Sequence, residues 1–530
     1  MSDVLVGLGV LAVAVAAAAA ILLPPGRPRS VAMLIALGLS PALILGDQWH
    51  SAEVTALRDD PARFTGLTAT ALAMSAALAA AFHRKPVLLP LAIVAALPFR
   101  IPIEAGGEEA NLLVPLYVVI ASGVFVTAYR TWTDPLASTR RAGPSGPATY
   151  VWLPRLLAAF VLLYGLQTLY SLDFSNGLQT LCFFLAPFSL AYAILREVRW
   201  SRRLLALALA LVAASAALFV AVGTVEYLTR ELLWNQQVIR SNEFHSYFRV
   251  NSLFWDPNIY GRYLALALAL LVGALLWARQ LRTTLALAGL CALLWVGLVP
   301  TFSQSSFAAL LGGLAILAAL RWSARWTAAA LAVGGVAALA AVLAVGGSLK
   351  VDFSRPNIDT SGRANLVSGG IELYGERPFR GYGAGSFPTA FRDKASDGKA
   401  PVSESHTEPI TVAAEQGTLA LFVYLGILIC AIGVMTTGMR RTMPGLRSSH
   451  LPPGDVDLGD HPEQRPQRRG GGTKSAAGPG GPAARAGIVA AFAALVVHTM
   501  AYAGFFDDPI TWVLLAIGAS LAAATLREQE

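Results

Sequence analysis

Apolar runs of about 20 residues follow one another along almost the whole chain, with polar connections between them. There are about fifteen runs, including one at 87–103, and each is long enough to cross the roughly 30 Å hydrocarbon layer as a helix. The runs do not alternate apolar with polar residues as barrel strands do, and helices satisfy the backbone hydrogen bonds that lipid cannot. The pattern predicts an all-α polytopic membrane protein with about 14 transmembrane helices.

Two long polar stretches and one stretch of low complexity interrupt this pattern. Residues 443–485 are rich in Gly, Pro, Arg and Ser and lack periodicity, so we expect a disordered cytoplasmic linker, either regulatory or a tolerated insertion. The predicted division is N-terminal transmembrane helices (1–225), an outer loop (226–258), transmembrane helices (259–348), a large outer loop that carries the chemistry (349–417), one transmembrane helix (418–437), the linker (438–485) and C-terminal transmembrane helices (486–530).

The charges indicate an orientation in the membrane. Only 14% of residues are charged, and the formal net charge of +8 comes mostly from short connections. Lys and Arg gather in alternate connections, which the positive-inside rule assigns to the cytoplasm, and the two long polar stretches then face outward. We therefore expect a multi-pass protein of the inner (plasma) membrane with its active site on the periplasmic or extracellular side, and no nucleic acid as a partner. The basic connections are 27–29, 83–85, 130–141, 196–203, 279–282, 321–325 and 440–447.

Several kinds of chemistry lack their usual signature. There is no phosphate-binding P-loop, which argues against primary transport by this chain alone. The cysteines, Cys182, Cys291 and Cys430, fall within predicted spans and have no metal or disulfide spacing. His498 also lies within a span, where packing with a hydrogen bond is the favoured interpretation. Asp507 and Asp508 are expected to end a helix.

The first outer stretch contains RVNSLFWDPNIYGRYLA, beginning at Arg249. Pro257 and Asn258 mark the start of a helix, which Asp256 or Asn258 can cap. The aromatic residues here are typical of a headgroup-level belt. A lone Arg among them calls for an anionic partner, such as a lipid-linked phosphate. Gln304 and three serines, in TFSQSSFAA, lie at the same outer level and could hydrogen-bond a ligand or one another.

The second outer stretch contains SGRANLVSGGIELYGERPF, which predicts a short amphipathic helix. Arg363 falls in its first turn, where a cation opposes the helix dipole and a bound phosphate would favour it. The glycine-rich segment RPFRGYGAGSF follows, with Arg380 and Tyr382 inside it. Its glycines form either a plain turn or a ligand cradle.

His406 is the third candidate feature of the outer stretches. A helix is predicted to begin near 407–409 and to continue into the next span. The helix dipole favours a neutral imidazole that can accept a proton, whereas the flanking Glu404 and Glu408 favour the charged form.

Three segments in this order resemble one family, the O-antigen ligase and O-antigen polymerase superfamily of membrane glycosyltransferases. The first is similar to the family's Arg and Pro-Asn helix start, the second to its Arg, amphipathic helix and glycine turn, and the third to its His-Asn segment. Thr407 stands where the family usually has Asn, and Gln304 where it often has Arg. The segments are RVNSLFWDPNIYGRYLAL (249–266), GRANLVSGGIELYGERPFRGYGAGSF (362–387) and SHTEPITVAAEQGTLALFVYLGI (405–427).

The resemblance implies a GT-C-like multi-helical fold whose outer loop covers a cavity open to lipid. It also implies a glycan donor on undecaprenyl diphosphate, a glycan acceptor, and an inverting transfer with no cofactor and no metal, because arginines take the place of the cation. Polymerisation of repeat units is favoured by the span count. The alternatives are ligation to lipid A-core or protein, and transport of a polysaccharide or lipid-linked substrate. Other polysaccharide-assembly proteins are further partners to consider. The implied roles are catalysis for His406, Glu408 and Glu404, diphosphate binding for Arg249, Arg363 and Arg380, and other substrate contacts for Asn258, Tyr382 and Gln304.

Overall fold

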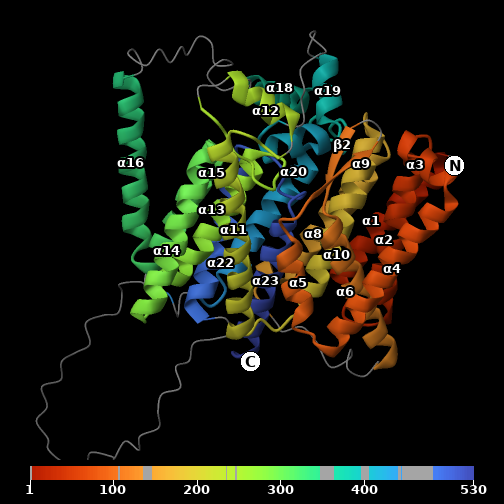
Figure 1. Ribbon diagram of the computed structural model, residues 1–530, viewed down its shortest axis with the longest axis horizontal. Helices are drawn as coiled ribbons and strands as arrows, with labels where there is room; N and C mark the ends of the chain where they lie inside the picture. Colours follow the sequence, from red (N-terminus) through yellow and green to blue (C-terminus); the bar gives the residue numbers. More distant parts are fainter. Residues whose placement is uncertain are drawn as a thin grey trace, which may run out of the picture.

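The computed structural model is an up-and-down bundle of long helices (Figure 1). Thirteen of its helices, among the described residues, are long and apolar enough to cross a membrane, which confirms the predicted all-α polytopic class. The structure describes residues 3–105, 108–134, 146–233, 235–244, 247–345, 363–394, 405–439, 443 and 481–530. Almost all of the predicted linker 443–485, together with Glu404, lies outside the described residues.

The N-terminal half supplies seven of these spans, of which α9, a π-helical turn and α10 together make one. The elements in order are α1 (Asp3–Leu22), α2 (Arg27–Asp47), α3 (Ala52–Asp59), α4 (Pro61–Arg84), α5 (Leu88–Ala96), β1 (Ile101–Ala105), β2 (Glu108–Leu112), α6 (Val114–Thr133), α8 (Ala148–Thr168), α9 (Phe174–Thr180), η1 (Leu181–Leu185), α10 (Ala186–Leu195) and α11 (Arg202–Thr229).

The C-terminal half supplies the other six spans and the short helices of the two outer stretches. The elements in order are α12 (Gln236–Phe244), α13 (Pro257–Leu276), α14 (Leu281–Leu298), η2 (Val299–Thr301), α15 (Gln304–Arg321), α16 (Ala324–Val345), α18 (Arg363–Glu376), α19 (Phe387–Lys394), α20 (Glu408–Met435), α22 (Gly481–Thr499) and α23 (Pro509–Arg527).

The prediction of a membrane span at 87–103 is wrong, because the structure has a short helix and a strand there. Its helix, α5, ends at Ala96, and β1 then pairs with β2 as an antiparallel hairpin in which Ile101 lies opposite Leu112. Two prolines explain the difference, because Pro98 and Pro102 lack the N–H that would continue the helix. The charged Arg100 between them would also have been costly inside lipid.

The helix ends define two faces of the bundle. The end of α1, the starts of α2, α8 and α11 and the end of α23 lie together at one face, where Arg29 pairs with Glu197. Arg130 on this face donates to the carbonyls of Phe82 and His83, and Arg321 to that of Leu276. We call it the basic face. The opposite face carries α3, α12, α18 and α19 (Figure 1), and we call it the loop face.

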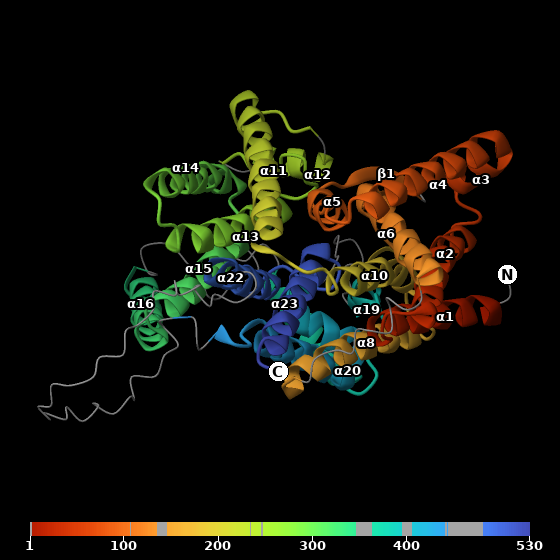
Figure 2. The ribbon, with the colours of Figure 1, turned by 90° about the horizontal axis from the view of Figure 1, so that it is seen from below.

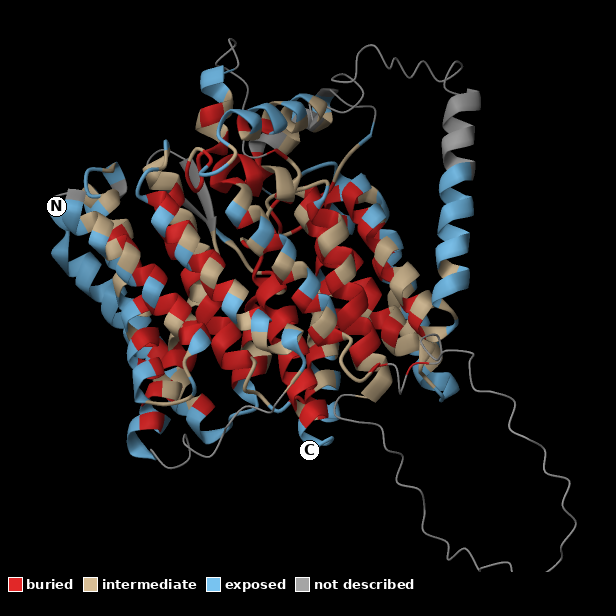
Figure 3. Ribbon diagram, turned by 180° about the vertical axis from the view of Figure 1, so that it is seen from behind, coloured by how far each residue is buried: buried red, intermediate tan, exposed pale blue. Residues whose placement is uncertain are grey.

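Two groups of helices flank a central set. Viewed along the spans, α1, α2, α4 and α6 lie on one side, and α11, α13, α14 and α15 on the other (Figure 2). Buried residues concentrate in the middle of the bundle (Figure 3), and among the spans α23, α10, α13 and α22 are the most buried. The outward sides of α4 and α14 are largely exposed, as expected for lipid-facing helices.

α20 is interrupted at Gly417, whose φ and ψ are 76° and −175°. The interruption leaves backbone N–H and C=O groups of α20 without partners inside the helix, and lipid cannot hydrogen-bond to them. The glycine turn 378–387 pairs with them: Tyr382 N donates to Ala414 O at 3.2 Å, Gly383 N to Glu415 O at 2.8 Å, and Thr418 N to Pro378 O at 2.7 Å. The large outer loop is thus attached to a broken membrane helix.

Candidate functional site

A polar cavity of about 610 Å³ lies at the loop face, among α8, α9, α19, α20 and the connection between α22 and α23. Its wall carries carboxylate and amide side chains from three separate parts of the chain. Such groups hydrogen-bond hydroxyls, so the lining suits a sugar better than a lipid tail. The polar lining includes Asp173, Asn176, Gln179, Arg392, Glu415 and Asp507, with Glu408 as the one predicted catalytic residue among the lining.

Arg249 lies beside the start of α13, as the sequence predicts for the first outer stretch. Its Nε donates to Thr301 O at 3.0 Å, and its Nη2 donates to Asn258 Oδ1 at 3.2 Å. Asn242 of α12 binds the backbone N–H and carbonyl of Arg249, each at 3.0 Å. The guanidinium is half-buried and held from two directions, so its position is fixed before any ligand binds. Asp256, not Asn258, caps α13.

A chain of serine hydroxyls continues from Asn258 into the bundle. Asn258 O accepts from Ser306 Oγ at 3.4 Å, and Ser306 Oγ lies 2.8 Å from Ser303 Oγ. Ser303 Oγ lies 3.1 Å from Ser305 Oγ, which lies 3.1 Å from His498 Nε2. His498 is fully buried, so the expected packing with a hydrogen bond is confirmed.

His406 joins the far end of this chain through aromatic contacts. The rings of His498 and Tyr502 have centroids 5.7 Å apart, and those of Tyr502 and His406 5.9 Å apart. His406 lies just before α20, in agreement with the predicted helix start. A continuous path of contacts, one of them through the backbone carbonyl of Asn258, therefore runs between Arg249 and His406 across α13, α15 and α22.

Three non-glycine residues around this path have a left-handed backbone. Their φ angles are 52° at Ser252, 47° at Phe302 and 62° at His406. Ser252 is held there by buried Glu226, whose Oε2 accepts from Ser252 N at 2.7 Å. Positive φ is costly for residues with a side chain and concentrates at functional sites. The two outer stretches thus have costly backbone conformations at His406 and three residues after Arg249.

Charged residues gather at the connection 504–508, beside the cavity. Arg262 of α13 pairs with Asp508 at 2.9 Å, and both side chains are almost fully buried. Arg100 lies within electrostatic range of both, and its burial lowers the pKa of its guanidinium, against the attraction of Asp508. Burial raises the pKa of Asp507 to about 7, repulsion from Glu408 adds to the effect, and Arg100 opposes it. Asp507 is thus a carboxylate in the cavity wall that titrates near neutral pH.

The two glutamates of α20 hold backbone in place. Glu408 Oε2 accepts from Gly504 N at 2.7 Å and from Phe505 N at 2.9 Å, which fixes the connection that carries Asp507. Glu415 accepts from Gly385 N at 3.0 Å and from Phe387 N at 2.9 Å, which fixes the end of the glycine turn. Both carboxylates therefore shape the cavity as well as line it.

The glycine turn packs against protein on several sides. Gly381, Gly383 and Gly385 have φ of 62°, 104° and 72°. A Cβ on Gly381 would lie 2.1 Å from Glu415 O, and one on Gly383 2.2 Å from Ser171 Cα. These glycines are needed for close approach to α20 and to the connection before α9, so a turn explains them without a ligand.

The remaining predicted residues have different surroundings. The side chain of Arg380 is exposed, and its carbonyl accepts from Tyr170 Oη at 2.7 Å. Tyr382 Oη donates to Glu376, and Arg377 stacks 4.3 Å from the Tyr382 ring. Gln304 begins α15 with an exposed side chain, while its serine neighbours are buried. Arg363 begins α18, and its side chain is outside what the structure describes.

Sequence reasoning missed the charged cluster at 504–508. Asp507 and Asp508 were expected to end a helix, but α22 ends earlier, at Thr499, and Asp508 caps the start of α23 by accepting from Ile510 N at 2.8 Å. The signal available was the order Asp-Asp-Pro, which is typical of a helix start. Neither Arg100 nor Arg262 was singled out, because only the tertiary fold pairs Arg262 with Asp508 and brings Arg100 within electrostatic range of it. Within the described residues there is no group of three or more His, Cys, Asp or Glu side chains placed to hold a metal ion.

Residues 289–425 match the family model described as O-antigen ligase. The match includes α15, the glycine turn and His406, and it confirms the resemblance of the chain to the O-antigen ligase and polymerase superfamily. Residues 289–425 thus resemble the O-antigen ligase domain of this superfamily, and the match implies a glycosyltransferase-type enzyme. No curated protein matches the chain.

Proposed function

We propose that this protein polymerises glycan repeat units carried on undecaprenyl diphosphate. The observation that supports the proposal most is the path from Arg249 to His406. It joins both predicted outer stretches at the loop face, beside a cavity lined by groups that bind hydroxyls. The coarser statement, a membrane glycosyltransferase of the O-antigen ligase or polymerase type, already follows from the family match.

In this proposal Arg249 binds the donor's diphosphate, with Arg363 and Arg380 as further cations of the large outer loop. A guanidinium can grip two phosphate oxygens at once, and charge on the leaving diphosphate grows in the transition state. Arg249 already uses its Nε and Nη2 within the protein, so these contacts orient the group for a ligand. Stabilising the departing diphosphate is the largest contribution we expect.

The acceptor sugar would occupy the polar cavity. Its hydroxyl oxygen attacks the donor's anomeric carbon, the bond from that carbon to the phosphate oxygen breaks, and the lipid diphosphate leaves with the electron pair. His406 or Asp507 takes the hydroxyl proton, and either group would contribute about 10²–10⁴-fold. Glu408 supports this step by holding the connection that carries Asp507. Inversion at the anomeric carbon follows from a single displacement.

The loop face would be periplasmic or extracellular. The basic connections gather at the opposite face, which the positive-inside rule places in the cytoplasm. Lipid-linked glycans reach such a site from the outer leaflet. Ligation to lipid A-core or to protein would use the same donor chemistry with another acceptor, so acceptor choice rests on the cavity's shape.

The experiment that tests the proposal uses purified protein with an undecaprenyl-diphosphate oligosaccharide. A ladder of products is expected. A single product that forms only when lipid A-core is added would identify a ligase, and an unchanged substrate with all additions would contradict glycosyl transfer. His406→Ala should abolish the ladder while the protein still inserts into the membrane.

A further inference from the structure

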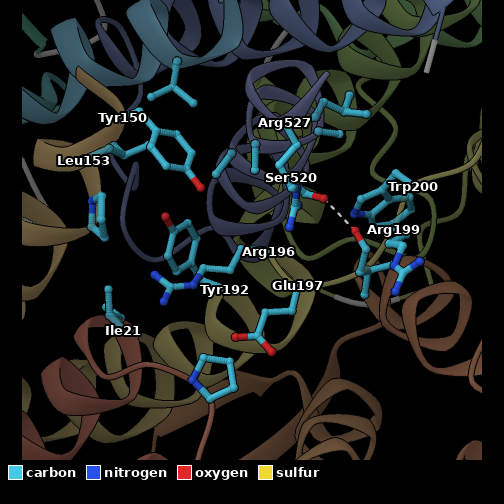
Figure 4. A pocket seen from close by; sticks show the side chains of 18 of the residues that line it. Ile21, Tyr150, Leu153, Tyr192, Arg196, Glu197, Arg199, Trp200, Ser520 and Arg527 are labelled. Carbon is cyan, nitrogen blue, oxygen red and sulfur yellow. Dashed lines mark hydrogen bonds between the residues drawn. The ribbon is translucent and has the colours of Figure 1, made fainter. Parts of the chain in front are cut away.

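A second cavity, of about 810 Å³, lies at the basic face, on the opposite side of the bundle from the candidate site. It forms where α1, α10 and α23 end and α8 begins, and Figure 4 shows its lining side chains. Neither the proposed reaction nor the family match uses it. Four arginines line it: Arg155, Arg196, Arg199 and Arg527.

The charge around this cavity is strongly positive. Two carboxylates, Glu197 and Glu528, also line it. Glu197 is ion-paired with Arg29, a buried residue behind the wall, so its charge is already compensated. Four arginines therefore face one remaining carboxylate. Arg196 is half-buried and the other three arginines are exposed. Like charges gathered around one cavity repel one another, and a bound anion would relieve that repulsion.

Two phenol groups add uncharged donors to this cationic wall. The hydroxyls of Tyr150 and Tyr192 point toward one another across the cavity (Figure 4). Arg196 and Arg527 both act electrostatically on Tyr150, and the Arg196 guanidinium lies 5.8 Å from the Tyr192 ring. Guanidinium groups and hydroxyls converging from different helices are the usual donors to phosphate oxygens.

Part of the lining is apolar, which suggests an amphiphile. Ile21, Leu22, Leu153 and Val434 line it from α1, α8 and α20, at the same helix ends that carry the arginines, so apolar and cationic groups face one cavity. We propose that this cavity binds the phosphate headgroup of an anionic phospholipid from the leaflet at the basic face. The glycerol and upper acyl carbons would lie along the apolar wall, and the phosphate would contact Arg196, Arg527 and the two tyrosines.

The site would link the lipid of one leaflet to the stability of the whole bundle. α8 and α20 line this cavity at one end and the polar cavity of the candidate site at the other. A ligand that binds only the folded protein stabilises it by mass action. Bound lipid should therefore raise the unfolding temperature of the protein even in the absence of glycan substrates.

The test measures lipid binding to the purified full-length chain by native mass spectrometry, together with its unfolding temperature in detergent. Phosphatidylglycerol should bind and raise the unfolding temperature, and phosphatidylcholine should do so far less. In Arg196→Gln/Arg527→Gln, affinity for phosphatidylglycerol should fall on the order of tenfold or more. Arg84→Gln, a change at another basic connection of the same face and outside the cavity, should leave binding unchanged.

Competition with inorganic pyrophosphate distinguishes a lipid headgroup from a soluble phosphate compound as the ligand of this cavity. Competition by pyrophosphate at low concentration, with weak lipid binding, would show that the cavity takes a soluble phosphate compound and would overturn the lipid assignment. Equal binding of both lipids, or equal loss in Arg84→Gln, would also overturn it. Arg196→Lys/Arg527→Lys is the control for misfolding of the glutamine variant. It keeps both charges and should retain part of the affinity for phosphatidylglycerol.

Discussion

Arg262 of α13 and Asp508 at the start of α23 form a buried ion pair of 2.9 Å, which ties two central helices together next to the candidate site. Removing one partner of such a pair leaves an uncompensated charge, which costs on the order of 3–5 kcal/mol. Arg262→Met should therefore lower the unfolding temperature in detergent strongly. Arg63→Met, at an exposed position of α4, is the matched control and should change little. An unfolding temperature equal to that of the wild type would show that Asp508 is stabilised by other groups.

The glycine turn gives a prediction about backbone strain. Gly383 has a φ of 104°, and a Cβ there would meet Ser171 Cα at 2.2 Å, so Gly383→Ala must displace the turn from the connection before α9. We expect loss of transfer activity and faster proteolysis within 378–394. Gly375→Ala is the matched control, because no atom lies within 4 Å of its added Cβ and Ala favours helix. Equal activity of the two variants would refute the packing argument.

Span positions could be predicted because the bilayer imposes a length on each apolar run. The prediction failed at 87–103, where two prolines end the helix and β1 begins. Arg249 and Asn258 could be placed in the same outer stretch from sequence because they lie close together along the chain. The contacts of Arg262 with Asp508, and of Glu408 with the connection 504–505, join distant segments, and no local pattern encodes them.

The geometry at Arg249 predicts that charge alone is insufficient. Its Nε and Nη2 donate in two directions, to Thr301 O and Asn258 Oδ1, and a lysine ammonium on a flexible stem cannot reproduce that fork. Arg249→Lys should lower kcat/KM by roughly 10²-fold or more, corresponding to about 2.7 kcal/mol. Arg240→Lys, at an exposed position of α12, should keep wild-type kinetics. Unchanged turnover in Arg249→Lys would leave Arg249 as an interface anchor only.

His406 should be needed for turnover and dispensable for folding. Its ring contacts Tyr502 and is half-buried, so His406→Ala removes little packing. We expect kcat to fall by about 10²–10⁴-fold with a normal elution profile in detergent. His50→Ala, an exposed histidine of the connection between α2 and α3, serves as the control. Wild-type kcat in His406→Ala would remove the imidazole from the reaction.

Asp507 should give activity and stability opposite dependences on pH. Burial raises the pKa of its carboxyl to about 7, above the ordinary value near 4. If the carboxylate takes the acceptor's proton, kcat should rise as pH increases through 7. The folded protein binds more protons than the unfolded chain between those two pKa values, so Asp507's contribution to stability is greatest below pH 4 and is lost as pH rises through 7.

Asp507→Asn separates these two effects. The variant should lose activity and the rise of kcat near pH 7, and its unfolding temperature at pH 8 should exceed that of the wild type because no buried carboxylate has to ionise. Asp59→Asn, at an exposed position at the end of α3, is the control and should keep both the activity and the pH profile of the wild type. If Asp507→Asn keeps both the activity and the pH profile of the wild type, the carboxylate has no part in proton transfer, and His406 is left as the base.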